Sequence, residues 1–499
     1  MITDTAINFR QYTRSEVEAM SESEKVSYIL ELQETILLLC GLCHALEARS
    51  QNVEQRFKEL EARLNQNSAN SSKPPSSDVF VKRPVKNLRE KSGRKRGGQP
   101  GHQGSTLRQV ETPDQVEKHA PAPCLCGHVF NGEEPKRIER HQVFDIPEPR
   151  VLVTEHQIEV CDCPNCGRVC KGILPPGVST APAQYGPGVL ALAVYLRVYQ
   201  FLPYERISQL CATVFGLALS KATIEAAEMR TDGELGPFIE ALKTALKDEP
   251  VLHADETGVR VEEDTRWLHV LATAKLTLYQ VHDKRGGEAM DAHEVLPEFN
   301  GTLIHDCWKP YFNYPCTHGL CNAHLLRELK FAHEELEQPW ALELFEFLMY
   351  AYDLVNEHDG VPFSSVALAS ITTMYDDILA RGQAQLPPDP PKTGLRGRTK
   401  KSKARNLHER LITRRDNVLL FVREPQVPFT NNIAEQAVRM AKVQQKISGC
   451  MRTFTGAQRF ARLRSYVSTV IKQGGNVLGH IVAAIAGTPS ITPLKVEPG

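Results

Sequence analysis

The 499-residue sequence predicts a multidomain α+β protein. Three observations carry this prediction: a heptad repeat near the N-terminus, a cluster of cysteines between residues 124 and 170, and alternating strand and helix patterns after residue 249. They correspond to an N-terminal coiled coil, a small zinc-binding module and an α/β core with a helical insertion. The composition, 41% hydrophobic and 24% charged, is ordinary for a globular protein and indicates no function by itself.

Residues 15–65 are expected to form an oligomerisation helix. Five heptads with one polar break favour a coiled coil and hence a homo-oligomer, whereas a helix packed on the chain's own core is the alternative. Ten of the eleven a and d positions are apolar, and Ser50 is the polar one. The eleven are Ile29, Leu32, Ile36, Leu39, Cys43, Leu46, Ser50, Val53, Phe57, Leu60 and Leu64.

A flexible basic linker is expected at residues 66–105, where Asn, Ser and Pro end the helix. Eight Lys or Arg residues between positions 82 and 96 face a single Glu, so the net charge of −1 hides a local basic segment. Such a run neutralises DNA phosphates, although a solvated tail has the same composition. The predicted DNA contacts in this linker are Lys82, Arg83, Arg94, Lys95 and Arg96.

Residues 106–180 contain six of the 13 cysteines. The first twenty residues of the chain lack the features of a secretory signal, so we expect a reducing cytosol, in which thiols serve as metal ligands or core residues. A Cys-Pro-Asn-Cys-Gly turn is typical of a structural zinc site, and the predicted ligands are Cys124, Cys126, Cys163 and Cys166. Only one residue separates the first pair, so Cys161 or His119 is an alternative ligand; unrelated buried cysteines are the other interpretation.

Residues 181–248 are expected to form a helical DNA-binding region. A helix, a break near Gly216 and a second helix opened by Ser220 are compatible with a helix-turn-helix, but a plain pair of packed helices has the same pattern. The longest apolar run, residues 188–198, contains Arg197 and is too short to span a bilayer, so no membrane partner is expected.

From residue 249 the pattern changes to three strand-like runs, a short helix and a fourth strand, which predicts a mixed α/β sheet. Asp255 lies on the first strand and Asp306 at the end of the fourth. If these strands are neighbours, their carboxylates meet at one edge and repel each other unless divalent cations bridge them. Mg²⁺, or Mn²⁺ in its place, would then support phosphoryl transfer.

A third carboxylate is expected on a helix that residues 430–432 cap. Its first turns carry Glu435 and then Arg439, a further predicted DNA contact. The positions on a strand, a strand end and a helix start distinguish this triple, because a chain with 60 acidic residues contains many others. Glu256 is expected on the opposite strand face from Asp255, as a structural group whose substitution costs less.

Five stretches, HADET, IHDCWKPY, CNAHLLREL, TNNIAEQAVRMAKVQQKISG and GAQRFARLRSYVSTVIKQGGN, resemble the insertion-sequence-66-type bacterial DDE transposases. The resemblance extends from about residue 30 to residue 481. It implies an RNase H-like core, metal-dependent cleavage and strand transfer at the element's ends, and a triad of Asp255, Asp306 and Glu435. It also implies terminal repeats and target DNA as partners, together with accessory proteins of the same element.

Three positions depart from the family pattern without touching the triad. The first cysteine pair has one intervening residue where two are usual, Gln436 follows Glu435 where Arg is usual, and Leu326 stands where a second basic residue is common.

The long interval between Asp306 and Glu435 predicts a helical insertion at about residues 323–425, within a catalytic domain of 249–480 that precedes a tail at 481–499. Cys316, His318, Cys321 and His324 offer a second zinc site or, alternatively, thiols and imidazoles used in packing. A basic loop at 390–406 would contact DNA if it shares a face with four arginines of the C-terminal region, Arg452, Arg459, Arg462 and Arg464, but ordinary solvated surface residues are the default interpretation.

Together these observations predict a cytoplasmic DDE transposase that joins the nucleoid when bound to DNA. Water would attack a phosphodiester at the element end, and the freed 3′ hydroxyl would then attack target DNA. Two alternatives stay open: a sequence-specific DNA-binding regulator, which does not need the acidic triad, and an RNase H-like nuclease without strand transfer.

Overall fold

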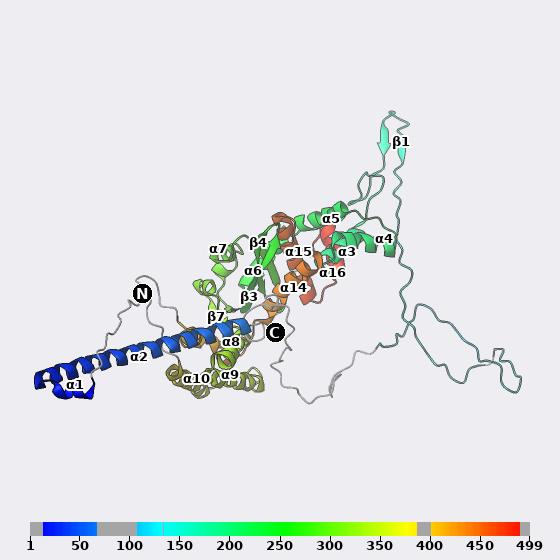
Figure 1. Ribbon diagram of the computed structural model, residues 1–499. Coiled ribbons are helices and arrows are strands. Elements are labelled where there is room, and N and C mark those ends of the chain that lie inside the picture. The colour runs from blue at the N-terminus through cyan, green and yellow to red at the C-terminus, as the bar shows by residue number, and fades with distance from the viewer. Residues whose placement is uncertain (1–12, 67–106, 133, 387–400, 490–499) are drawn as a thin grey trace. The chain divides into compact units, whose positions relative to one another are not determined.

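The computed structural model describes residues 13–66, 107–132, 134–386 and 401–489, which form two compact units (Figure 1). One unit, here called the helical unit, comprises Met1–Arg83 and Cys321–Phe429, and the other, the sheet unit, comprises Pro84–Leu320 and Thr430–Gly499. The five basic residues predicted to contact DNA between positions 82 and 96 lie outside the described residues. Within the described ranges, no helix combines the length and the apolar character that a membrane crossing requires.

The helical unit contains a single long helix and the insertion. Its elements are α1 (Arg14–Ala19), α2 (Glu22–Asn65), α8 (Asn322–Leu336), α9 (Pro339–Glu357), α10 (Ser365–Gln385), α11 (Lys403–Thr413), α12 (Arg415–Val418) and α13 (Leu420–Arg423). The C-terminal end of α2 packs on α8, where Ala62 is buried and the Asn65 amide donates to Glu335 at 2.9 Å. The Asn322 N–H donates to the Phe429 carbonyl at 3.0 Å, so the two ends of the insertion meet.

The sheet unit is built on five strands: β3 (Val251–Val261), β4 (Asp264–Ala272), β5 (Thr277–His282), β6 (Thr302–His305) and β7 (Thr317–Leu320). Their order is β5-β4-β3-β6-β7: the β5–β4 and β4–β3 pairs are antiparallel, whereas the β3–β6 and β6–β7 pairs are parallel. The predicted mixed sheet is confirmed, and its first and fourth predicted strands, β3 and β6, are adjacent, which is the condition for their carboxylates to meet. The sequence did not predict β7, because its four residues carry no alternating pattern and overlap a Cys/His motif.

Helices cover both faces of this sheet (Figure 1). They are α3 (Pro187–Val198), α4 (Tyr204–Phe215), α5 (Lys221–Gly233), α6 (Gly236–Lys247), α14 (Asn432–Ser448), α15 (Phe454–Lys472) and α16 (Val477–Ile485), with α7 (Gly287–Asp291), η2 (Leu296–Glu298) and η3 (Lys309–Asn313) in the connections. Because strand side chains alternate, Leu252 faces one core with α6 and α16, whereas Val259 faces the other with α14. Helix α15 contributes to both cores.

The helices predicted between residues 187 and 247 are confirmed. Helix α4 ends at Gly216, whose φ of 65° is left-handed, and the Ser220 hydroxyl caps α5 by accepting from the Thr223 N–H at 3.0 Å. Behind this pair, the buried Glu228 carboxylate accepts from the Tyr204 hydroxyl at 2.9 Å and lies 3.5 Å from the Arg197 guanidinium. Whether the pair binds DNA remains a prediction.

Gly301 allows β6 to approach the start of β3. A Cβ at this position would lie 2.7 Å from the carbonyl oxygens of Glu249 and Pro250, which is closer than real Cβ contacts. The Thr302 N–H donates to the same Pro250 carbonyl at 2.9 Å, so the backbone cannot easily move away.

We therefore expect Gly301→Ala to destabilise the sheet unit by about 1–3 kcal/mol, because overpacking against backbone forces strand displacement. Urea unfolding followed by tryptophan fluorescence measures the effect. Gly188→Ala on α3 is the control, since a Cβ there meets open space. Equal unfolding midpoints for the two variants would contradict this reading of Gly301.

Candidate active site

Asp255 and Asp306 lie side by side on the neighbouring inner strands β3 and β6, at the point where β6 ends. Strands β3 and β6 are parallel, with His253 paired to Ile304. Two residues further along the same register stand Asp255 and Asp306, and both are partly exposed. The strand arrangement expected from the sequence is therefore the one that brings these two carboxylates together.

Glu435 comes from the first turn of α14, which packs against β3 and β4. Its negative charge is one of those that raise the pKa of Asp255. Asp255 and Asp306 are thus neighbours on adjacent strands, and Glu435, 180 residues after Asp255 in the chain, adds its negative charge to theirs.

The Asp255 carboxyl has a pKa well above its ordinary value. Burial is the largest cause, followed by the negative charges of Glu256, Asp306 and Glu435, while the Glu256 N–H, which donates to Asp255 Oδ1 at 2.9 Å, opposes the shift. Crowded carboxylates of this kind gain stability from a divalent cation, and an all-oxygen donor set suits Mg²⁺ or Mn²⁺. Asp255, Asp306 and Glu435 are the residues that could hold such an ion.

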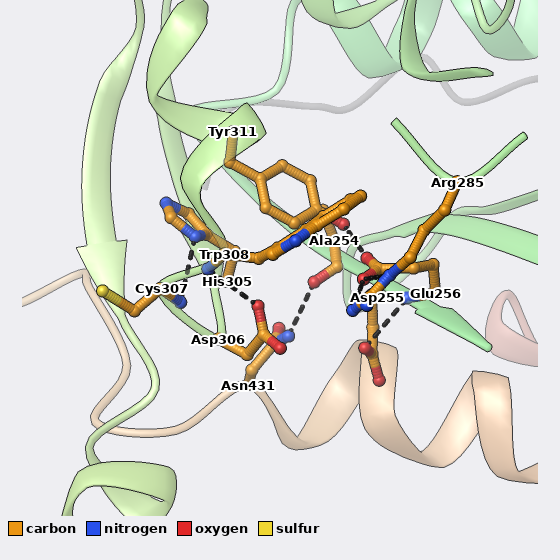
Figure 2. A network of polar contacts seen from close by, with 10 residues as sticks. All are labelled: Ala254, Asp255, Glu256, Arg285, His305, Asp306, Cys307, Trp308, Tyr311 and Asn431. Atoms are coloured by element: carbon orange, nitrogen blue, oxygen red, sulfur yellow. Dashed lines mark hydrogen bonds and ion pairs between the residues drawn. The ribbon is translucent and has the colours of Figure 1, made fainter. Parts of the chain in front are cut away.

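Glu256 points to the opposite face of β3, as the sequence predicts, and is held by two partners (Figure 2). Its Oε1 accepts from Arg285 Nε at 3.0 Å and Nη2 at 2.7 Å, and its Oε2 accepts from the Tyr311 hydroxyl at 2.5 Å. Burial and the charge of Asp306 raise the pKa of Glu256, whereas Tyr311 and Arg285 oppose that shift. Tyr311 belongs to η3, so this contact ties the loop after Asp306 to β3.

Arg285 is itself fixed between aromatic rings. Its guanidinium carbon lies 4.1 Å from the Trp308 ring centre and 4.9 Å from that of Trp267. The backbone N–H of Trp308 in turn donates to Asp306 Oδ1 at 3.1 Å (Figure 2). A planar guanidinium suits both stacking on aromatic rings and two-point binding of a carboxylate. Arg285 thereby links Glu256 to Trp308, the residue whose backbone bonds to Asp306.

A chain of histidines supports the same loop from beneath. The Cys307 N–H donates to His305 Nδ1 at 3.2 Å, and His305 Nε2 lies 3.3 Å from His318 Nδ1. His318 Nε2 lies 3.1 Å from the Tyr314 carbonyl, which fixes it as a donor and His318 Nδ1 as an acceptor. These contacts place a proton on Nε2 of each ring, and His305, which is fully buried, supports the Asp306 loop.

The helix-capping prediction for residues 430–432 is wrong in its detail. Asn431 stands at the N-cap of α14, but its side chain makes no capping hydrogen bond. The side chain instead bonds to His253 and Ala254 on β3. Sequence alone could not distinguish these uses, because the competing partner lies 178 residues away.

The condition under which four C-terminal arginines would contact DNA, that they share an exposed face, is not met. Arg459 and Arg464 are buried, and the Arg464 guanidinium stacks on Tyr199 and Phe201. Arg462 binds both carboxylate oxygens of Asp232. Arg452 is exposed, as is Arg439 on α14, so the predicted DNA contact at Arg439 stays available.

The predicted zinc ligands lie in two local turns of similar form. In the first, the Cys124 N–H donates to the His128 carbonyl and the Gly127 N–H donates to the Cys124 carbonyl, both at 2.8 Å. In the second, between β1 (Val160–Asp162) and β2 (Val169–Lys171), the Cys163 N–H donates to Arg168 at 2.9 Å and the Gly167 N–H donates to Cys163 at 2.8 Å.

Backbone N–H groups favour the thiolate in both turns. The pKa of Cys124 is lowered by the backbone N–H of Cys126, and the pKa of Cys163 is lowered by those of Asn165 and Cys166. Thiolates are the metal-binding form of cysteine.

The four residues of the other Cys/His motif divide between the units. Cys316 and His318 belong to the sheet unit, where the thiol lies 4.0 Å from the His318 Nε2, and Cys321 and His324 belong to the helical unit. The structure therefore uses His318 in the support of the Asp306 loop, as one of the two sequence interpretations anticipated.

Two family models match parts of the chain. A family model described as Transposase IS66 family matches residues 182–459, more than half of the chain, and the match includes all three carboxylates. A second model, a family of unknown function termed DUF6444, matches residues 13–108. No curated protein matches the chain. The chain belongs to the IS66 family of transposases.

Proposed function

We propose that this transposase cleaves DNA at the ends of its insertion sequence and joins the freed ends to target DNA through a triad of Asp255, Asp306 and Glu435. The observation that carries the proposal is the parallel register of β3 and β6, which sets two aspartates next to each other beside the first turn of α14. Three antiparallel strands followed by two parallel ones support an RNase H-like core for this site.

The chain's own residues would position the reacting groups. A bound Mg²⁺ or Mn²⁺ ion would supply activation of the attacking hydroxyl and stabilisation of the leaving oxygen. The carboxylates of Asp255, Asp306 and Glu435 would hold it, and the negative field that raises the pKa of Asp255 favours its binding. Arg439, exposed one turn after Glu435, would contact the DNA backbone.

The zinc module is proposed to close around one ion with Cys124, Cys126, Cys163 and Cys166. Support comes from the two similar turns and from the backbone N–H groups that lower the pKa of one thiol in each. Together with the α4–α5 pair and the basic linker, this module would bind the element's terminal repeats. Accessory proteins of the same element and a cytoplasmic site of action remain part of the proposal.

Helix α2 is proposed to pair with α2 of a second copy. It is continuous over 44 residues. Apolar residues at predicted a and d positions are exposed along it, among them Ile29 at 53%, Ile36 at 56% and Phe57 at 65%. A row of exposed apolar side chains at heptad spacing is the surface that a coiled coil covers.

The triad is tested by Asp255→Asn, Asp306→Asn and Glu435→Gln in a strand-transfer assay with the element's own DNA ends. We expect each variant to lose strand-transfer activity by more than roughly 100-fold, the upper range for replacing residues that only orient metal ligands, while DNA binding stays nearly intact. Asp264→Asn, at a side chain 67% exposed, is the matched control. Near-normal transfer by any triad variant would remove that residue from the site, and cleavage without joining would indicate a nuclease.

The zinc proposal predicts about one zinc per full-length chain, measured by elemental mass spectrometry. Cys163→Ser and Cys166→Ser should each reduce the zinc content well below that of the wild type, because a structural zinc site depends on four protein ligands. Cys450→Ser, at an exposed thiol, should keep it. A folded full-length protein without zinc would contradict the proposal.

The coiled-coil proposal predicts that Ile36→Glu lowers the oligomeric mass measured by light scattering, because it places a charge in the apolar seam. Ser27→Glu on the same helix adds the same charge outside the a and d positions and should leave the mass unchanged. Ile36 is exposed in the single chain, so its substitution should not unfold the protein. Equal masses for both variants would show that α2 does not mediate assembly.

A further inference from the structure

The contact between Asn431 and β3 has no role in the function described so far. Asn431 is 1% exposed and stands between β3 and the helix that carries Glu435. Its Nδ2 donates to the Ala254 carbonyl at 2.8 Å, and its Oδ1 lies 2.9 Å from His253 Nδ1. One side chain thus bonds both residues that precede Asp255 on the strand (Figure 2 shows the contact to Ala254).

The orientation of the Asn431 amide follows from chemistry. The Ala254 carbonyl can only accept, so the amide nitrogen must face it and the amide oxygen must face His253. His253 therefore carries its proton on Nδ1 and donates to Asn431. Both hydrogen bonds are buried, because His253 is only 3% exposed, and breaking either would leave a buried polar group unsatisfied.

The backbone of Asn431 continues the connection to Glu435. Its carbonyl accepts from the Glu435 N–H at 3.1 Å, which is the first hydrogen bond of α14. The same residue therefore holds the strand of Asp255 through its side chain and the turn of Glu435 through its main chain.

An asparagine at an N-cap ordinarily bonds to the N–H groups of its own helix and thereby stabilises the helix start. Asn431 forgoes that bond and turns to β3. The helix thus gives up a local contact for one that fixes its start against the strand.

We propose that Asn431 is a positioning residue of the metal site, which sets Glu435 relative to Asp255 and thereby determines the affinity for the divalent cation. This inference rests on the proposed function, in which both carboxylates hold that cation. Groups that orient metal ligands typically change metal affinity by about 10–100-fold when they are replaced.

The test measures Mn²⁺ binding by the full-length protein through the electron paramagnetic resonance signal of free Mn²⁺, and the Mn²⁺ concentration for half-maximal DNA cleavage. Asn431→Ala should weaken both by about tenfold or more. Asn431→Asp should not restore them, because its second oxygen would face the Ala254 carbonyl. Asn432→Ala is the matched control: the neighbouring side chain is exposed and should leave both values within about twofold, the scatter expected of a surface site.

Circular dichroism and thermal melting without metal identify any variant that fails to fold. In that case His253→Phe, which keeps a ring but removes the donor to Asn431, should weaken Mn²⁺ binding in the same direction. A folded Asn431→Ala or His253→Phe protein with wild-type Mn²⁺ affinity would overturn the inference.

Asp255→Asn separates this inference from the proposed function. If Asp255→Asn loses Mn²⁺ binding while Asn431→Ala keeps it, the metal site stands and the role of Asn431 fails. If the wild type binds no Mn²⁺ in either measurement, or Asp255→Asn binds as the wild type does, the proposed metal site fails and the inference fails with it.

Discussion

Mutual repulsion between carboxylates is the constraint around which the sheet unit is organised. Asp255, Glu256, Asp306 and Glu435 all lie close enough to act on the same ionisation, that of Asp255. Left to themselves these groups would move apart or take up protons. The fold keeps the carboxylates from moving apart because the residues that flank Asp255 hold two segments to β3: the loop that follows Asp306 and the start of α14.

The two attachments use the alternation of the strand. On one face, Glu256 receives the Tyr311 hydroxyl and so holds the loop that begins with Asp306. On the other face, His253 Nδ1 donates to the Asn431 amide oxygen and so holds the helix of Glu435, while the Ala254 carbonyl accepts from the nitrogen of the same amide. Neighbouring strand residues point to opposite sides. The residues before and after Asp255 can therefore hold two different segments, the loop of Asp306 and the helix of Glu435.

These attachments also explain how far the sequence could be interpreted. The local patterns around Asp255, Asp306 and Glu435 predict a strand, a strand end and a helix start, and the structure places them so. The partners Tyr311, Arg285 and Asn431 carry no local signal, because each contact joins segments from 29 to 178 residues apart. Arg464 misled for the same reason: a basic residue on a helix is typical of a solvated surface, yet its aromatic partners come from the distant segment around residue 200.

The large insertion does not disturb this arrangement, since its two ends meet. The Asn322 N–H bonds to the Phe429 carbonyl, so the chain leaves the core after β7 and returns before α14 through adjacent backbone. A segment with closely spaced ends can be long without stretching the core that it interrupts. The distance in sequence between Asp306 and Glu435 therefore places little demand on the site.

The distribution of charge distinguishes the triad from its fourth acidic neighbour. Glu256 has a side chain only 1% exposed and a cation of its own in Arg285, which two tryptophan rings fix in place. That guanidinium is occupied by Glu256 on the far face of the strand. Arg285 therefore offsets the charge of Glu256 only in part, because that charge still raises the pKa of Asp255, and the negative charge around Asp255 supports the proposal that a cation from solution binds there.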